Sequence, residues 1–186
     1  MNIVQPIRDL QKLEEMKEEL KKTGTRNYMM FLTGINSGIR ISDLIKLNVD
    51  DVRNQDGTMK QHITIIEKKT KKIKKFPLCN VLYTEMEKYT RHMTQGEFLF
   101  CSRNGKNKPI TTLQAYRIIV EAGEHIGLKN IGTHTMRKTF GYHHYKQYKD
   151  VALLQTIFNH SSPSITLRYI GISQDEIDTS YKNFSL

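Results

Sequence analysis

The chain has 186 residues, which is enough for one compact domain with a substantial hydrophobic core. Apolar residues make up 38% of it, and no apolar run approaches the ~18 residues that would span a bilayer, so a transmembrane protein is not expected. Lys and Arg number 29 against 19 Asp and Glu, and the resulting net charge of +10 favours a polyanionic partner such as DNA.

The N-terminus and the cysteines argue against secretion, disulfide bonding and zinc binding. The opening MNIVQPIRDL has no basic segment leading into an apolar core and a small-residue cleavage site, so we expect no secretory signal and a cytoplasmic location. Cys79 and Cys101 are too few and too isolated for a disulfide framework, and neither lies in a CxxC pattern.

Helices are predicted for the first quarter of the chain. Four apolar residues recur at helical spacing among Glu and Lys, and Gly24 follows where a helix often ends. A second apolar stretch, residues 28–35, is typical of a buried helix, and residues 42–47 form a short helical pattern. Arg40 lies at the break between these two segments. The four residues of the first helix are Leu10, Leu13, Met16 and Leu20.

The pattern changes in the middle of the chain. Residues 61–78 combine the β-branched segment HITII, a lysine-rich centre and KKFPL, which predicts strand, turn and strand in a small antiparallel sheet. Asn80 and Thr112 each stand where they can cap a following helix, and residues 98–102 are expected to add a short strand between those helices.

The last third is helical by the same tests. The predicted helices cover residues 134–148, residues 151–158 and a segment that starts at Ser162-Pro163 and leads to Tyr169. We therefore expect an α+β fold, mainly α-helical, in which a helical bundle carries a small antiparallel β-sheet.

The strongest local signal for chemistry is the tetrapeptide His134-Thr135-Met136-Arg137. Residues i and i+3 of a helix point to the same side, so His134 and Arg137 can form one site. On the tetrapeptide alone, a solvated pair that occurs by chance is the simpler explanation, because short motifs give false positives.

Three other segments complete a pattern. GIRISDL places Arg40 upstream, IIEKKTKKIKKFPL supplies a lysine-rich turn, and FNHSSPSITLRYIG places a tyrosine nine residues after a histidine. Together with His134 and Arg137, this order and spacing resemble the tyrosine recombinase family of the phage integrase type over nearly the whole chain. The resemblance implies six catalytic residues, which are Arg40, Lys69, His134, Arg137, His160 and Tyr169.

The family's fold and reaction follow as expectations. A member is expected to have the integrase catalytic-domain fold and to act on double-stranded DNA as a site-specific recombinase or integrase of phages, prophages and mobile elements. It cleaves and rejoins DNA through a 3′-phosphotyrosine, here on Tyr169, and needs no cofactor. Two arginines suit this chemistry, because guanidinium groups bind phosphate oxygens and stay charged at any working pH. They take the place of a metal cation, so no metal site is expected.

The hairpin lysine is assigned by counting. Lys69 lies eight residues before Pro77, which is the family position, and the resemblance implies that it is the general acid for the leaving 5′-oxygen. Its neighbours Lys68, Lys71 and Lys72 are candidates for DNA binding. A solvated, phosphate-binding run is the alternative for most lysines of this turn.

The chain departs from the family in two respects. Phe158-Asn159-His160 stands where relatives more often have Leu-Gly-His. Most relatives carry an N-terminal DNA-clamping domain, whereas this chain starts almost at once with the catalytic-domain helix. Residues 1–186 are therefore expected to be the catalytic domain alone, as an excised fragment or a naturally minimal member. Asp43 resembles a family acid that supports the site, although a helix-capping or surface role is equally open.

Two other functions and two roles for the C-terminal segment remain open at this stage. A type IB topoisomerase shares the tyrosine chemistry, but the short chain and GIRISDL favour a recombinase. A non-catalytic DNA-binding protein is disfavoured by the complete set of six residues. Residues 173–186 carry an apolar stripe that predicts either docking on a neighbouring protomer, as in a multimer on DNA, or folding back on the same domain. The stripe consists of Ile177, Tyr181 and Phe184.

Overall fold

The computed structural model describes residues 4–172 and 181–185, and all structural statements refer to these residues. This part of the chain is mainly α-helical with one antiparallel β-hairpin, as predicted. None of its helices is long and apolar enough to cross a membrane. The elements are α1 (Leu10–Thr23), α2 (Thr25–Ser37), α3 (Ile41–Leu44), α4 (Val49–Val52), β1 (His62–Ile66), β2 (Ile73–Pro77), α5 (Asn80–Thr90), α6 (Thr112–His125), α7 (Thr133–Tyr148), α8 (Val151–Phe158) and α9 (Pro163–Ile170).

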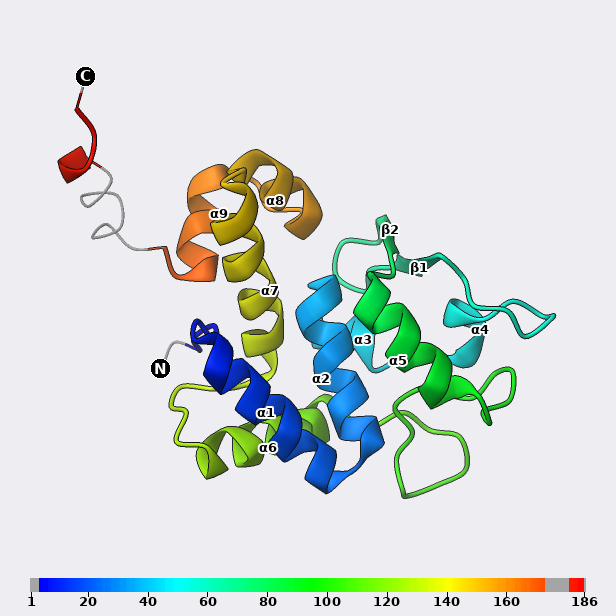
Figure 1. Ribbon diagram of the computed structural model, residues 1–186. Coiled ribbons are helices and arrows are strands. Elements are labelled where there is room, and N and C mark those ends of the chain that lie inside the picture. Colours follow the sequence, from blue (N-terminus) through cyan, green and yellow to red (C-terminus); the bar gives the residue numbers. More distant parts are fainter. Residues whose placement is uncertain (1–3, 173–180, 186) are drawn as a thin grey trace.

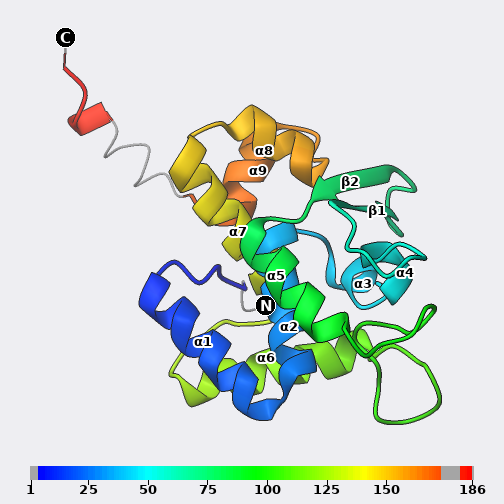
Figure 2. The ribbon, with the colours of Figure 1, turned by 45° about the vertical axis from the view of Figure 1, so that its right-hand side comes forward.

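Helix α2 is at the centre of the main hydrophobic core. It is buried along most of its length because it packs against α1, α5 and α7 (Figure 1). Leu13, Met16 and Leu20 of α1 face this core, whereas Leu10 is 64% exposed although it shares their spacing. Helices α1 and α6 lie side by side at one end of α2, which closes the core from that side (Figures 1 and 2).

A second, smaller core lies farther along α7. It is formed by Leu154, Phe158 and Ile170, and it holds α8 and α9 against each other and against α7 (Figure 2). Gly141 of α7 makes the close packing possible, because a Cβ at this position would lie 2.7 Å from side-chain atoms of both Phe158 and Ile170. The segment that carries Tyr169 is thus held by this second core.

The β-hairpin lies beside α4 and is buried on one face. Ile63 of β1 stands opposite Phe76 of β2, and both side chains are buried. Opposite residues of an antiparallel pair share a face, so the hydrophobic alternation sets the register of the two strands. The turn between the strands, residues 67–72, reaches Asn159 at the end of α8.

Three local predictions differ from the structure. Asn80 does not cap a helix, because α5 begins at this residue and no side chain caps it. Thr111, and not Thr112, caps α6, since Thr111 and Gln114 exchange hydrogen bonds between side chain and backbone in a capping box. Residues 98–102 form isolated bridges rather than a strand.

Candidate active site

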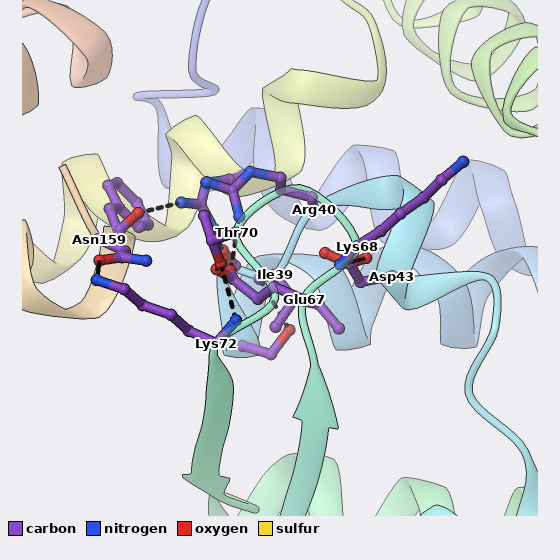
Figure 3. Close-up of polar contacts among 12 residues, drawn as sticks. Ile39, Arg40, Asp43, Glu67, Lys68, Thr70, Lys72 and Asn159 are labelled. Atoms are coloured by element: carbon purple, nitrogen blue, oxygen red, sulfur yellow. Dashed lines mark hydrogen bonds and ion pairs between the residues drawn. The ribbon is translucent and has the colours of Figure 1, made fainter.

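Arg40 follows a tight turn between α2 and α3 that depends on a glycine. Gly38 ends α2 with a φ of 59°, which is a left-handed conformation. Glycine adopts this conformation at little energetic cost because it has no Cβ. A Cβ at this position would also lie 2.4 Å from the ring of Phe140 on α7. The chain therefore passes directly beneath α7 and places Arg40 at the start of α3, next to the hairpin turn (Figure 3).

Arg40 forms an ion pair with Glu67, the first residue of the hairpin turn (Figure 3). Its Nη1 lies 2.6 Å from Oε1 of Glu67, which is 2% exposed, and Oε2 of Glu67 accepts a hydrogen bond from Thr70 Oγ1 at 2.7 Å. Burial alone would raise the pKa of Glu67, but the hydrogen bonds from Thr70 and Arg40 bring it below its usual value. Glu67 is therefore charged at neutral pH.

Two further hydrogen bonds hold the hairpin turn. Asp43 Oδ1 accepts the backbone N–H of Lys68 at 3.0 Å, and the Asp43 side chain is buried. Neither a surface role nor a helix cap describes Asp43, which instead supports the turn. Lys72 Nζ donates to Asn159 Oδ1 at 2.9 Å, so the residue that replaces the family's glycine contacts the hairpin (Figure 3).

The other lysines of the turn point to solvent. Lys69, the predicted general acid, is exposed. Its ammonium group lies near His134 and His160, because its charge acts on both histidines. Lys68 and Lys71 are exposed as well. The turn therefore presents free ammonium groups beside the predicted catalytic residues.

Arg137 connects the two sides of the site. It is 2% exposed on α7, and its guanidinium donates to the carbonyl oxygen of Gly38 and, at 2.9 Å, to that of Phe158. Its Cζ also lies 4.3 Å from the centre of the Phe158 ring. Arg137 thus joins the turn that precedes Arg40 to the end of α8, two residues before His160.

Tyr169 lies on α9, which begins at the predicted Ser162-Pro163 start and is capped by the Ser162 side chain. Its Oη is 3.1 Å from Nδ1 of His134, and the charge of the Arg137 guanidinium acts on it. Burial raises the pKa of the Tyr169 hydroxyl, while the charges of Arg137 and Arg40 act in the opposite direction. The phenol is therefore protonated at neutral pH and must lose its proton to become a nucleophile.

Both predicted histidines are neutral at neutral pH. Burial, reinforced by the charge of Arg137, lowers the pKa of His134 below its usual value and that of His160 to about 4. His160 Nδ1 lies 3.1 Å from Thr166 Oγ1, and this contact fixes the imidazole with its centre 5.1 Å from that of the Tyr169 ring. A neutral imidazole can accept a proton, so His134 is placed to take one from Tyr169.

The six predicted residues lie in one site together with two residues that the sequence analysis missed, Glu67 and Lys74. Lys74 Nζ is buried without a hydrogen-bond partner in the described residues, and burial together with the charge of Arg137 lowers its pKa to about 8. Both residues lie in or beside the lysine-rich turn, which the sequence indicated to be solvated and not buried. Strand alternation was the available signal, because Ile63 and Ile65 point inward and place Glu67 on the same face, with Lys74 opposite Ile65.

Comparison with known sequences identifies relatives along the whole chain. The model of the phage integrase family matches residues 8–176. The chain is 50% identical over 184 residues to the probable integrase/recombinase YoeC of Bacillus subtilis (strain 168), which covers 99% of this chain and 98% of that protein. It is 25% identical over 178 residues to the tyrosine recombinase XerA of Pyrococcus furiosus, covering 95% of this chain and 60% of XerA.

Solved structures share the fold. A crystal structure of XerA recombinase matches with a TM-score of 0.75 at 19% identity and covers 97% of this chain and 63% of that one. XerH bound to a palindromic difH substrate matches with a TM-score of 0.73 at 18% identity, covering 98% and 53%. The chain spans nearly all of YoeC but less than two thirds of these Xer proteins. The predicted integrase catalytic-domain fold is confirmed, and the chain belongs to the phage integrase family of tyrosine recombinases.

Proposed function

We propose that residues 1–186 are the catalytic domain of a site-specific recombinase in which Tyr169 cleaves and rejoins DNA. One observation carries the proposal: the Tyr169 hydroxyl lies 3.1 Å from His134, a neutral histidine, and beside the guanidinium of Arg137. A nucleophile, a base and a phosphate-binding cation converge at one point. This arrangement suits phosphoryl transfer through a covalent link between protein and DNA.

Groups of the site account for each bond and each proton of the cleavage reaction. Tyr169 Oη gives its proton to His134 and forms a bond to the scissile phosphorus, while the bond from phosphorus to the 5′-oxygen breaks. Lys69 donates a proton to the departing 5′-oxygen. The products are a 3′-phosphotyrosine and a free 5′-hydroxyl. Rejoining is the reverse reaction with the 5′-hydroxyl of the strand that is to be joined.

Arg40 and Arg137 are the proposed clamp for the scissile phosphate. A guanidinium has five N–H donors, and each of these arginines uses part of them on protein acceptors. The remaining donors are available to the equatorial phosphate oxygens, whose charge they stabilise in the transition state. His160, fixed by Thr166, completes the wall of the site beside Tyr169.

A nicked suicide duplex tests the proposal, because the short strand that carries the 5′-hydroxyl diffuses away after cleavage and leaves the adduct trapped. We expect the wild-type protein to form a covalent DNA adduct in EDTA, since arginines supply the positive charge at the phosphate. Denaturing gel electrophoresis detects the adduct, and mass spectrometry locates it on the peptide that contains Tyr169. A strict requirement for Mg²⁺, or an adduct on another peptide, contradicts the mechanism.

Double-stranded DNA is the proposed partner. The net charge of +10 and the exposed Lys68 and Lys71 at the edge of the site suit contacts to phosphate groups, which depend on charge rather than on base sequence. Structures with the same fold include XerH bound to difH and a lambda integrase dimer bound to a COC′ core site, which supports this partner. Lys72 is proposed to contact DNA as well, in addition to its hydrogen bond with Asn159.

The C-terminal segment is proposed to dock on a neighbouring protomer when DNA is bound. Tyr181 and Phe184 are 78% and 68% exposed, and residues 181–185 lie apart from the helices in both views (Figures 1 and 2). Ile177, the third residue of the apolar stripe, lies outside the described residues. Two exposed aromatic side chains on one short segment favour burial against another surface.

Deletion of residues 175–186 is therefore expected to reduce multimer formation on DNA while DNA binding by the single protomer persists. Native sizing of protein–DNA complexes measures the first property, and a mobility-shift titration measures the second. The double substitution of Tyr181→Ser with Phe184→Ser keeps the length of the chain. It should reduce multimer formation as the deletion does if the two aromatic side chains make the contact. Identical multimers from the truncated and full chains would refute docking in trans.

A further inference from the structure

The inward position of Glu67 follows from the phase of β1. Ile63 is buried and Ile65 is partly buried, and side chains two residues apart share a face of a strand, so residue 67 continues the inner face. The turn is closed there by backbone hydrogen bonds from Glu67 N–H to the Lys72 carbonyl at 3.0 Å and from Lys71 N–H to the Glu67 carbonyl at 2.9 Å. A carboxylate that is 2% exposed must find partners inside the protein.

The two carboxylate oxygens of Glu67 contact two different parts of the site (Figure 3). Oε1 accepts from Arg40 Nη1 at 2.6 Å, and Oε2 accepts from the hydroxyl of Thr70 at 2.7 Å. Thr70 directly follows Lys69, the proposed general acid. The Glu67 carboxylate therefore contacts both Arg40, a residue of the proposed phosphate clamp, and the turn that carries Lys69. Charge-assisted hydrogen bonds of this kind are short and directional.

Glu67 is also a counter-charge for a cationic site. Its negative charge acts on Arg137 and on Lys74, and Lys74 Nζ is buried without a hydrogen-bond partner in the described residues. In the absence of DNA, these cations and Arg40 would repel one another without a buried anion among them. The Glu67 carboxylate, together with that of the buried Asp43, whose charge also acts on Lys74, thus allows the positive groups to stay close before a phosphate arrives.

We propose that Glu67 is a positioning residue, which sets Arg40 and the Lys69 turn in one arrangement before DNA binds. The inference rests on the proposed function of Tyr169 and deepens it. A phosphate that enters the site meets an arginine and a proton donor that are already oriented, so less reorganisation is needed in the transition state. Asp43 also anchors the turn, through the backbone N–H of Lys68. Because the turn has this second anchor, we assign to Glu67 the orientation of Arg40 and Lys69 and not only the holding of the hairpin.

Two suicide substrates separate the parts of this role. One carries the natural 5′-oxygen at the scissile phosphate, and the other carries sulfur in its place. A thiolate is a far weaker base than an alkoxide, so the sulfur leaving group departs without a general acid. A defect in the placement of Lys69 is therefore restored by the sulfur substrate, as it is for Lys69→Ala, whereas a defect in the phosphate clamp, as in Arg40→Ala, persists with both substrates.

We expect Glu67→Gln to cleave the oxygen substrate at least about tenfold more slowly, the scale of one hydrogen bond to a charged group, and to lose less on the sulfur substrate. Thr70→Val removes the turn contact and leaves the Arg40–Glu67 pair, so it should lose rate on the oxygen substrate and regain the wild-type rate on the sulfur substrate. Glu85→Gln, which breaks an exposed 2.9 Å pair with Lys88 on α5, should match the wild type on both.

The outcomes that overturn the inference are distinct from failure of the proposed function. Wild-type rates for Thr70→Val on the oxygen substrate, or equal losses on both substrates for Glu67→Gln and Thr70→Val, would remove Glu67 from the placement of Lys69. Thr70→Val alone decides the matter if Glu67→Gln does not fold, as judged by circular dichroism. Absence of an adduct in the wild-type protein contradicts the proposed function itself, and with it this inference.

Discussion

Replacement of Tyr169 by phenylalanine is expected to abolish the covalent DNA adduct while DNA binding persists. The substitution removes the attacking oxygen, and removal of a nucleophile costs on the order of 10⁴-fold or more in rate. The phenyl ring keeps the edge contacts that Tyr169 makes with Phe158 and His160, whose ring centres lie at 5.6 and 5.1 Å, so α9 should stay in place. Adduct yield on the nicked duplex and affinity in a mobility-shift titration are the two measurements.

Tyr148→Phe is the matched control for this experiment. Tyr148 is 57% exposed at the end of α7 and outside the site, so its substitution should leave adduct formation at the wild-type level. An adduct from Tyr169→Phe at the wild-type yield would show that another group attacks the phosphate. Loss of DNA binding together with the adduct would show that the tyrosine is needed for the fold of the site rather than for the chemistry.

The second large effect is expected for the two arginines, and it should differ between them. Arg40→Ala and Arg137→Ala should each slow cleavage by about 10²- to 10³-fold, the usual cost of losing a preorganised contact to transition-state charge. Arg137→Ala should also lower thermal stability, because the carbonyl groups of Gly38 and Phe158 lose a buried donor, at about 1–3 kcal/mol for each unsatisfied group. Single-turnover cleavage and thermal denaturation separate the two contributions.

Arg137→Lys sharpens this test. A lysine keeps the positive charge but has no planar fork with which to reach the two carbonyl groups and the phosphate at once. It should therefore recover little of the cleavage rate. Near-normal cleavage by Arg137→Ala or Arg40→Ala would take that residue out of the phosphate clamp, whatever the change in thermal stability.

The helices and the order of the site residues could be predicted because local periodicity and spacing carry that information. The start of helix α9 followed from the Ser162-Pro163 pair, and the structure adds that Ser162 is its cap. The cap of α6 was wrong by one residue, since Thr111 and Thr112 are equally good candidates and the choice depends on the reciprocal contact with Gln114.

Contacts between distant segments could not be predicted in the same way. The partners of Arg137, the carbonyl groups of Gly38 and Phe158, are 99 and 21 residues away, and a carbonyl group has no sequence signature. Glu67 is a different case, because strand phase did indicate its inward position. The surrounding lysines suggested a solvated turn, and the contacts of Arg40 and Thr70 with the carboxylate explain why it is buried there.

From the two hydrophobic cores we expect two levels of cooperativity in the unfolding of the domain. Tyr169 and His160 belong to the small unit built on Leu154, Phe158 and Ile170, and release of this unit exposes three buried side chains at about 1.5–3 kcal/mol each. We expect the main core, with Arg40 and the hairpin, to stay folded in such a sub-global opening, which costs less than unfolding of the domain. Tyr169 and His160 would then leave the site while Arg40 and the hairpin turn keep their arrangement.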